Sequence, residues 1–281
     1  MSSLQNKIDF AVIITVLRAN PNGDPLNGNR PRTDYDGFGE ISDVCLKRKL
    51  RDRLQEQGES IFVQSDDRKI DTLPSLRKRA ESAEHGLGTA AFGAQADKDT
   101  TAKAACAKWF DVRTFGQLFA FGGGGGDGSG VSIPIRGPVT LQAAVSVEPV
   151  SVSSMQITKS VSGEGDGTKR GSDTMGMKHR VDKGVYVAFG SMNPQLAERT
   201  GFSDSDAEII KGILPKLFEN DASSARPEGS ISVAKVFWWK HNCKAGQHSS
   251  FKVHHSLTVN ADGSYALANL PALAPEEIDG F

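Results

Sequence analysis

The chain alternates between compact apolar runs and long polar stretches, and the apolar runs predict the elements of a core. Residues Ile8 to Leu17 form a continuous apolar, β-branched run that is too short for a helix and is typical of a buried strand. Residues Ser230 to His241 and Phe251 to Val259 have the same character and predict two later strands. The core is therefore expected to be built around a β-sheet.

Two helices are predicted from apolar spacing and capping residues. Ser42 is a suitable N-cap for a helix that runs to about Gln57, with Gly58 as its stop. A second helix is predicted from Ser205 to about Phe218, with Pro215 bending it. In the first helix the core stripe recurs every four residues, at Leu46, Leu50 and Leu54.

Three polar stretches interrupt this core. Residues Glu59 to Lys108 predict a helical insertion outside the sheet. Residues Ser153 to Arg180 lie between two β segments, Val139 to Val152 and Gly184 to Ser191, and predict a hairpin arm that leaves the sheet. The glycine run from Gly122 to Gly130 predicts a flexible loop, because the Lys-Ser/Thr of a phosphate-binding P-loop does not follow it. These elements favour a single α+β domain with an antiparallel sheet and helices on one face, as in ferredoxin-like or RRM-like folds.

Composition narrows the class of protein. The chain has 281 residues, of which 38% are hydrophobic, enough to bury a core. Its polar N-terminus predicts no signal peptide, and no apolar run approaches the roughly 20 residues of a membrane helix. Three widely spaced cysteines without a CxxC argue for a reduced compartment and against a disulfide framework or a zinc site. We therefore expect a cytoplasmic protein with no membrane partner.

The charge is near neutral overall but unevenly distributed. The formal net charge is −1, which alone counts against nucleic-acid binding. Residues Val44 to Arg53 nevertheless carry a local net charge of +4, and residues Met155 to Lys183 carry +2. Like charges four residues apart on a helix, such as Lys47 and Arg51, cost stability unless something neutralises them. A basic face and an acidic face fit both polyanion binding and self-assembly.

The loop after the first strand, Arg18 to Asp34, reads RANPNGDPLNGNRPRTD. Its prolines restrict the backbone, its glycines allow left-handed conformations, and its asparagines can cap turns. A strand that ends in such a rigid, polar, cationic loop usually displays it to a partner. The alternative is a long turn-rich loop with no such role.

Candidate catalytic groups are few. The histidines lack the HExxH spacing of a metal site, and no GxSxG motif supports serine hydrolysis, so neither a metal nor another cofactor is expected. His254 and His255 are adjacent in a predicted strand, which would direct the two rings to opposite faces. His179, at the end of the arm, could act as a general base in RNA cleavage, but stacking or hydrogen bonding at a nucleic-acid surface is the favoured interpretation.

The candidate residues for polyanion binding agree on a common role better than the candidate catalytic residues do. Arginine forks onto phosphate oxygens, lysine acts as a point charge, and exposed methionines beside cations can separate stacked bases. The methionines Met155, Met175 and Met177 flank the base of the arm, where the alternative is packing against its own sheet. The predicted polyanion-binding residues, which would bind RNA if the polyanion is RNA, are Arg18, Asn20, Asn22, Arg30, Arg32, Lys47, Arg48, Arg51, Arg113, Arg136, Met155, Lys159, Lys178, His179 and Arg180.

Several motifs, in order along the chain, resemble one family. They are NPNGDPLNGNRPRTD from Asn20, DVCLKRKLRDRL from Asp43, FDVRTFG from Phe110, IRGPVTLQAAVSVEPV from Ile135 and SSARPEG from Ser223. Together they resemble the CRISPR-associated Cas-seven family, the backbone subunit of the Cascade surveillance complex, in its Csd (type I-C) branch. The resemblance implies a modified RRM-like palm at about residues 5–57, 109–151 and 182–265. It also implies fingers at 58–108 and a thumb at 152–181.

The resemblance implies a function without catalysis. Copies would stack head to tail along a CRISPR RNA, grip its backbone without reading sequence, and present it for pairing with target DNA. Other partners would be a Cas-five-type subunit and a large subunit of the complex. Two alternatives stay open: a stand-alone endoribonuclease of the same superfamily with His179 as base, and a self-assembling shell protein. Whether the Asn20 to Arg32 loop touches RNA or the next subunit is also open.

Overall fold

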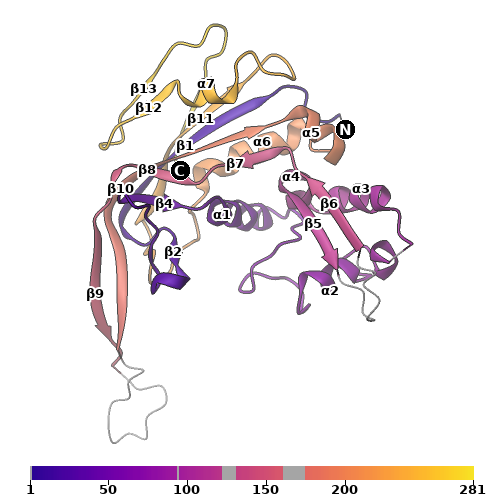
Figure 1. Ribbon diagram of the computed structural model, residues 1–281, viewed down its shortest axis with the longest axis horizontal. Coiled ribbons are helices and arrows are strands. Elements are labelled where there is room, and N and C mark those ends of the chain that lie inside the picture. The colour runs from indigo at the N-terminus through magenta and orange to yellow at the C-terminus, as the bar shows by residue number, and fades with distance from the viewer. Residues whose placement is uncertain (1, 94, 122–130, 161–174) are drawn as a thin grey trace, which may run out of the picture.

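The computed structural model describes residues 2–93, 95–121, 131–160 and 175–281. Its main feature is a large antiparallel sheet in the order β14-β11-β1-β10-β8-β4, with β7 and β9 also paired to β10 (Figure 1). The strands of this sheet are β1 (Ile8–Ala19), β4 (Phe38–Ile41), β7 (Val139–Leu141), β8 (Ala144–Pro149), β9 (Val152–Thr158), β10 (Met175–Met192), β11 (Ile231–Lys240) and β14 (Glu276–Asp279). The predicted strands Ile8 to Leu17 and Ser230 to His241 are therefore confirmed as β1 and β11, and they are neighbours in the sheet.

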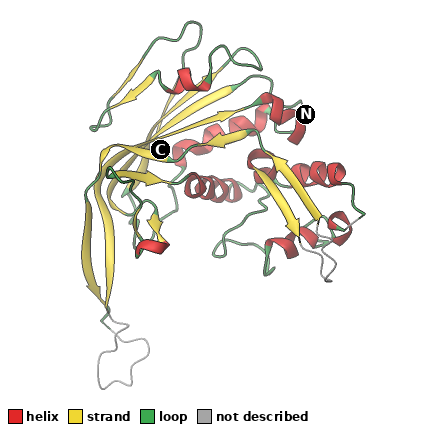
Figure 2. Ribbon diagram, viewed as in Figure 1, coloured by secondary structure: helices red, strands yellow, loops and turns green. Residues whose placement is uncertain are grey.

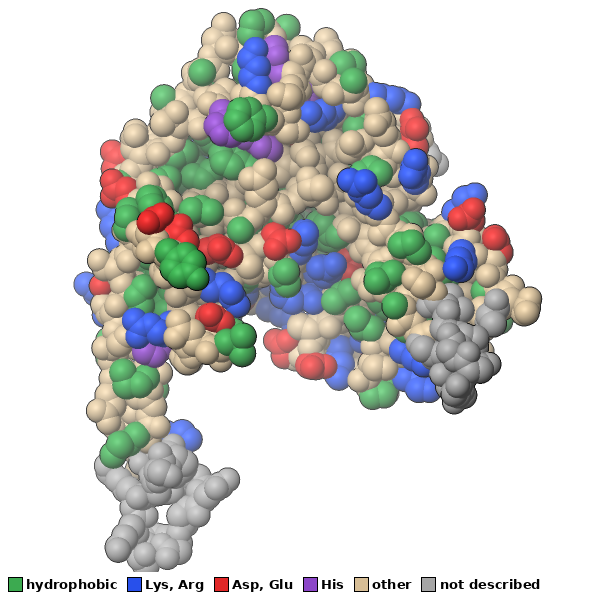
Figure 3. Space-filling view, viewed as in Figure 1, with side chains coloured by type: hydrophobic (Ala, Val, Ile, Leu, Met, Phe, Trp, Pro, Cys, Tyr) green, Lys and Arg blue, Asp and Glu red, His purple; other side chains and the backbone are tan. Residues whose placement is uncertain are grey.

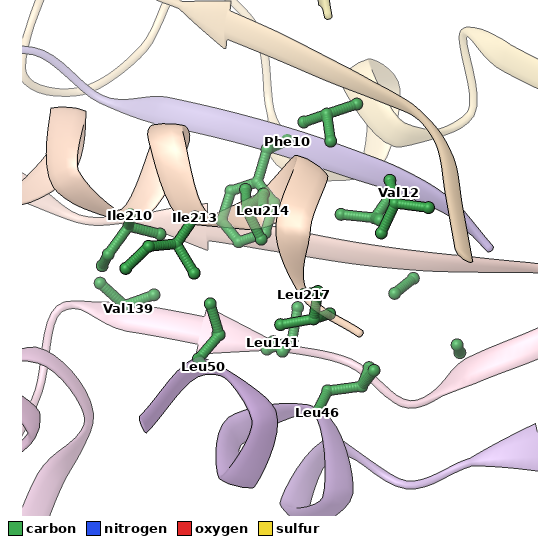
Figure 4. Close-up of a cluster of buried hydrophobic side chains, with 14 of the residues drawn as sticks. Phe10, Val12, Leu46, Leu50, Val139, Leu141, Ile210, Ile213, Leu214 and Leu217 are labelled. Atoms are coloured by element: carbon green, nitrogen blue, oxygen red, sulfur yellow. The ribbon is translucent and has the colours of Figure 1, made fainter. Parts of the chain in front are cut away.

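Both faces of the sheet are covered, because β1 is apolar on both sides. Phe10, Val12 and Ile14 pack into one core with the helices α1 (Asp43–Glu56) and α6 (Asp204–Ile213) and the turn η4 (Leu214–Lys216) (Figure 4). Ala11 and Ile13 pack on the opposite face beneath α7 (Ser250–His254) and the hairpin of β12 (Leu257–Val259) and β13 (Tyr265–Leu267). The expectation that the helices lie on one face is wrong, because α7 lies on the face opposite α1 and α6.

The predicted strand Phe251 to Val259 is also wrong in its first half. Ser249 caps α7 by accepting a hydrogen bond from the Lys252 amide, and only Leu257 to Val259 is extended. The adjacent Val253 and His254 are both buried, whereas Phe251, Lys252 and His255 are exposed, and this pattern fits a helical turn and not the alternation of a strand. His254 and His255 consequently do not alternate across a strand.

The helices of the first core follow the predicted pattern with one shift. α1 begins after Ser42, whose side chain accepts from the Cys45 amide, and Leu46, Leu50 and Leu54 are buried. α6 is capped by Ser203 rather than Ser205, because the Asp206 side chain accepts from the Ser203 amide in a capping box. The turn η4, which contains Pro215, follows it directly.

A second lobe lies beside the sheet and has its own aromatic core of Phe62, Phe92, Trp109 and Phe119. It includes a hairpin that we expected in the sheet core: among the described residues β5 and β6 pair only with each other, and they pack among the lobe's helices. The lobe contains α2 (Leu76–Glu81), η2 (Thr89–Phe92), α3 (Lys98–Lys108), α4 (Phe110–Phe115), β5 (Gly116–Phe121) and β6 (Val131–Arg136), and α5 (Pro194–Thr200) contacts α3 and α4.

The predicted arm is a two-stranded ribbon that projects from the sheet (Figure 2). β9 pairs with the first half of β10 from Thr158 opposite Met175 to Val152 opposite Val181. The remainder of the predicted arm, 161–174, and the predicted glycine loop, 122–130, lie outside the described residues. Among the helices of the described residues, none is long and apolar enough to cross a membrane.

Candidate nucleic-acid interface

Lysine and arginine side chains gather in the hollow between the arm and the second lobe, over α1 (Figure 3). Each of the five cations of α1 is nevertheless bound to a carboxylate of the same molecule, and two of these carboxylates are distant in sequence. These contacts neutralise the like charges that the helix would otherwise place four residues apart. The pairs are Lys47 with Asp43 (2.9 Å), Arg48 with Asp52 (2.9 Å), Arg51 with Asp111 (2.9 Å), Lys49 with Asp221, and Arg53 with Glu56 (2.8 Å).

Arg51 and Asp111 join α1 to the second lobe. The fully buried Asp111 carboxylate accepts from the Phe62 amide at 2.7 Å, from the Val63 amide at 3.0 Å and from Arg51. The Arg51 guanidinium also lies over the Phe115 ring, 5.0 Å from its centroid. This geometry makes Arg51 a structural clamp that holds the lobe against the helix.

Arg113 makes a second clamp on the other side of α4. Its guanidinium binds both carboxylate oxygens of Asp206, the shortest contact being 2.9 Å, and lies 4.4 Å from the centroid of Phe110. Asp206 also caps α6 through Ser203, so one carboxylate orders two elements. The predicted binding residues Arg51 and Arg113 therefore have internal partners that a nucleic acid would have to displace.

An open groove of about 590 Å³ separates α1 from the base of the β5–β6 hairpin, and Lys47 and Arg136 both line it. Phe115 and Thr140 complete its wall and floor. Arg136 is exposed, and its side chain has no hydrogen-bonding or ionic partner among the described residues. Two of the predicted cations, far apart in the chain, thus meet at one surface.

Two motif glycines set the shape of this groove. A Cβ on Gly116, whose φ is +81°, would lie 2.2 Å from the Ile135 carbonyl oxygen. A Cβ on Gly137 would lie 2.3 Å from the Thr114 carbonyl oxygen. The backbones of the FDVRTFG and IRGPV motifs are therefore in close contact, and this contact fixes Arg136, in the second motif, at the groove.

The loop after β1 is rigid for reasons internal to the protein. It contains β2 (Gly23–Asp24), the turn η1 (Pro25–Asn27) and β3 (Arg30–Pro31), with β2 and β3 paired. The Asn22 side chain accepts from the Ser42 amide at 2.9 Å and the Ser42 hydroxyl at 2.8 Å, and so orients the N-cap of α1. The buried Asn20 side chain donates to the Asn29 carbonyl at 2.7 Å. Both asparagines thus hold the loop together.

The loop also contacts the arm. One Arg30 nitrogen donates to the Ser154 hydroxyl at 3.0 Å and lies 3.4 Å from His179 Nδ1, which is 2.8 Å from the same hydroxyl. Because a guanidinium only donates, Nδ1 must accept and the imidazole proton sits on Nε2. In this arrangement His179 presents a donor, which suits hydrogen bonding to a phosphate better than proton abstraction.

The predicted arm residues divide between two faces of the ribbon. In an antiparallel pair, opposed residues share a face, and β10 alternates along its length. Lys178 opposes Met155 and Arg180 opposes Ser153, so these residues lie on one face. The exposed Lys159 follows the end of β9 directly. The other face carries His179 with the exposed Met175 and Met177. The prediction that these methionines are exposed is confirmed.

Two other predicted arginines lie near the loop. Arg18 is exposed near the end of β1 with a left-handed φ of +52°, and it has no partner among the described residues. Arg32 forms an ion pair with Asp24 at 3.5 Å across the β2–β3 ribbon. Sequence reasoning missed Ser154, Phe115 and Thr140, because their roles depend on contacts between distant segments. Within the described ranges, no cluster of three or more His, Cys, Asp or Glu residues could hold a metal ion.

Comparisons with known proteins agree on one family. The model of the family described as CRISPR-associated protein Cas7 matches residues 6–272. A curated relative from Haloferax volcanii, CRISPR-associated protein Cas7, is 28% identical over 230 residues, which cover 78% of this chain and 66% of that protein, slightly less than two thirds.

Solved structures of similar shape include two chains titled as CRISPR RNA-guided surveillance complexes. One, titled pre-nicking, has a TM-score of 0.48 at 17% identity and covers 83% of this chain and 75% of its own. The other has a TM-score of 0.45 at 15% identity, with 83% and 68% covered. Because the family model spans nearly the whole sequence, the family that the motifs resembled is confirmed, and the chain belongs to the CRISPR-associated protein Cas7 family.

Proposed function

We propose that this chain is a CRISPR-RNA-binding backbone subunit of a Cascade surveillance complex of type I-C, and that it is not a nuclease. Copies would stack head to tail along the guide, bind its backbone without reading sequence, and present its bases to target DNA, beside a Cas-five-type and a large subunit. The sheet would be the RRM-like palm, the second lobe the fingers, and the β9–β10 ribbon the thumb. Membership of the Cas7 family supports this function, but it does not locate the RNA.

The observation that carries the proposal is the groove between α1 and the β5–β6 hairpin. Lys47 and Arg136 line the same open surface, and Arg136 has no anionic partner among the described residues. Lys47 pairs with the half-exposed Asp43 at 2.9 Å, a weak surface contact that a phosphate can displace, whereas the charge of Arg136 is unpaired within the described part of the chain. We assign the first phosphate contacts to Lys47 and Arg136, and further contacts to Arg18, Lys159 and Lys178.

Arg48, Arg51 and Arg113 are assigned a structural role and no direct contact with RNA. Arg48 binds Asp52 and the Val63 carbonyl, while Arg51 and Arg113 bind buried carboxylates. Reversing the charge of Lys47, Arg48 and Arg51 together would therefore lose RNA and stability at once, and such a variant would not separate the two. A clean test of the groove leaves Arg48 and Arg51 unchanged.

The test is the double variant Lys47→Glu with Arg136→Glu. Purified wild-type protein should carry protected RNA of uniform spacing, seen in its absorbance ratio and on a denaturing gel. The double variant should carry little RNA, and in a salt titration its slope of log K against log salt should fall by about 1.4, since each single-strand phosphate contact contributes about 0.7.

The matched control is Lys98→Glu, an exposed cation at the start of α3 where a carboxylate favours the helix dipole. It should retain RNA and the full slope. Equal RNA retention in the double variant and the control, with equal slopes, would exclude this groove. Degraded RNA in the wild-type preparation would instead favour the endoribonuclease, and absent RNA the shell protein.

A further inference from the structure

A second basic surface lies on the face of the sheet opposite the proposed groove. The segment from Lys240 to Ala261 contains three lysines and four histidines and no aspartate or glutamate. Histidine and lysine side chains gather with a hydrophobic ring at the top of Figure 3, over α7 and its neighbouring loops. The proposed binding of the guide in the groove does not use this segment.

The helix α7 displays an aromatic ring and a cation while it buries its other side. On the side of α7 that faces the sheet, Val253 is fully buried, and His254 is buried with its Nε2–H donating to the Gly190 carbonyl at 3.1 Å. Phe251 in contrast is 72% exposed. Lys252 is also exposed and has no side-chain partner among the described residues. The helix is therefore anchored firmly, and the exposed side chains project from a fixed base.

The aromatic ring belongs to a stack that is already formed. The His255 imidazole lies on Phe251 with a centroid separation of 3.9 Å and an interplanar angle of 26°. Its Nδ1–H donates to the Phe251 carbonyl at 2.8 Å, which fixes the orientation of the ring and leaves Nε2 free to accept. One face of Phe251 is covered in this way, and the large exposure of the side chain leaves the other face open.

The acidic groups near this surface do not cancel its charge. Asp9 lies under the helix, fully buried and hydrogen-bonded to His241 at 2.9 Å. Glu198 binds Lys244, which leaves Lys240 and Lys252 without a carboxylate partner among the described residues. Asp262, the first acidic residue after the segment, is hydrogen-bonded to Ser264. The surface is thus cationic where its aromatic stack is exposed.

We propose that Phe251, Lys252 and His255 form a second nucleic-acid site, the α7 surface, which binds single-stranded nucleic acid. A base continues the stack on the open face of Phe251, and Lys252 neutralises the adjoining phosphate. A duplex is excluded, because its bases already cover each other's faces. An aromatic stack beside unpaired cations is the arrangement of single-strand platforms, whereas an acidic protein partner would use the lysines but not the stack. Because β1 separates the two cores, both sites can be occupied together.

The first experiment uses Phe251→Trp as a local reporter. The three native tryptophans, Trp109, Trp238 and Trp239, are at most 2% exposed. The introduced indole is exposed, so its emission is shifted to the red and is quenched by acrylamide. These two properties separate its signal from that of the buried tryptophans. An oligothymidylate should quench this emission by stacking, and inorganic polyphosphate of equal charge should not. Quenching reports only the α7 surface, so it remains informative whether or not the groove binds the guide.

The second experiment measures affinity of the full-length protein, as purified, for a labelled oligothymidylate. Phe251→Ala should weaken binding by about 5- to 150-fold, the range observed when one base loses its aromatic partner. Phe281→Ala, which removes a ring that is 76% exposed elsewhere on the surface, is the matched control and should leave the affinity unchanged. Absence of quenching together with equal affinities of Phe251→Ala and the control would overturn the proposal. Loss of affinity in Lys252→Glu with unchanged affinity in Phe251→Ala would also overturn it, because charge alone would then account for the binding.

Discussion

The helix α1 and the β9–β10 arm are both basic in sequence, yet they use their charges differently. On α1 the five cations between Lys47 and Arg53 each bind a carboxylate of the same chain. On the arm, Lys159 and Lys178 have no such partner among the described residues, and Arg180 reaches Asp182 only at 3.8 Å. The denser cluster is the one that holds the protein together.

The difference comes from where the counterions lie in the sequence. Asp111 and Asp221 are 60 and 172 residues from the arginine and lysine that they neutralise. A local count of charge along α1 cannot include them, so it overstates the charge that a ligand would meet. A two-stranded ribbon that leaves the sheet has few neighbours, so its local count is closer to the charge it displays. The predictions below test this contrast on α1 and on the arm, and extend it to the buried groups Asp9 and His254.

The largest effect is expected from Asp111→Ala. This buried carboxylate accepts from Arg51 and from two backbone amides, and its loss leaves a partly buried guanidinium and two amide groups unpaired. We expect the free energy of unfolding to fall by about 3–5 kcal/mol, the usual cost of breaking a buried ion pair from one side. Urea denaturation followed by tryptophan fluorescence measures it.

The control for this variant is Asp66→Ala, which removes an exposed carboxylate that pairs with Lys69 at 3.0 Å. Surface pairs of this kind contribute at most about 1 kcal/mol. If the two variants unfold with the same free energy, the Arg51–Asp111 pair is not structural, and the contrast between α1 and the arm fails.

A smaller effect is expected from pH, through the buried cluster of Asp9 and His254. Burial lowers the pKa of His254, although the charge of Asp9 partly opposes it. Burial also disfavours ionisation of Asp9, but hydrogen bonds from His241 and Ser250 outweigh it and lower its pKa. Both groups therefore bind protons more readily in the unfolded chain than in the folded chain. The stability that they contribute is fully present above pH about 6.5, and it is lost as the pH falls, first through protonation of His254.

The measurement is the free energy of unfolding between pH about 7.5 and about 5.0, where His254 contributes a slope of at most about 1.4 kcal/mol per pH unit. In His254→Gln, an amide that can still donate to the Gly190 carbonyl replaces the titrating ring. Its slope should be shallower by that amount. A variant slope that matches the wild type would show that His254 does not titrate in this range.

Much of the fold could be predicted, because it depends on local patterns. The apolar run at Ile8, the cap at Ser42 and the leucine stripe of α1 each act within a few residues. The site was harder, because its geometry depends on contacts between distant segments. Nothing near Arg113 in sequence reveals Asp206, and nothing near Asn22 reveals that it orients the N-cap of α1. The β5–β6 hairpin was misplaced for the same reason, since its aromatic partners belong to other segments.

The smallest change in stability, and the sharpest test of the contrast, comes from comparing Lys178→Gln with Arg48→Gln. Lys178 has no side-chain partner among the described residues, so its replacement should alter the free energy of unfolding by less than about 0.5 kcal/mol. It should still lower the salt slope of RNA binding by about 0.7. Arg48 binds Asp52 and the Val63 carbonyl, so its replacement should cost about 1–3 kcal/mol and leave the slope unchanged. The reverse outcome, a destabilised Lys178 variant and a shallower slope for Arg48, would mean that the helix displays its charge and the arm does not.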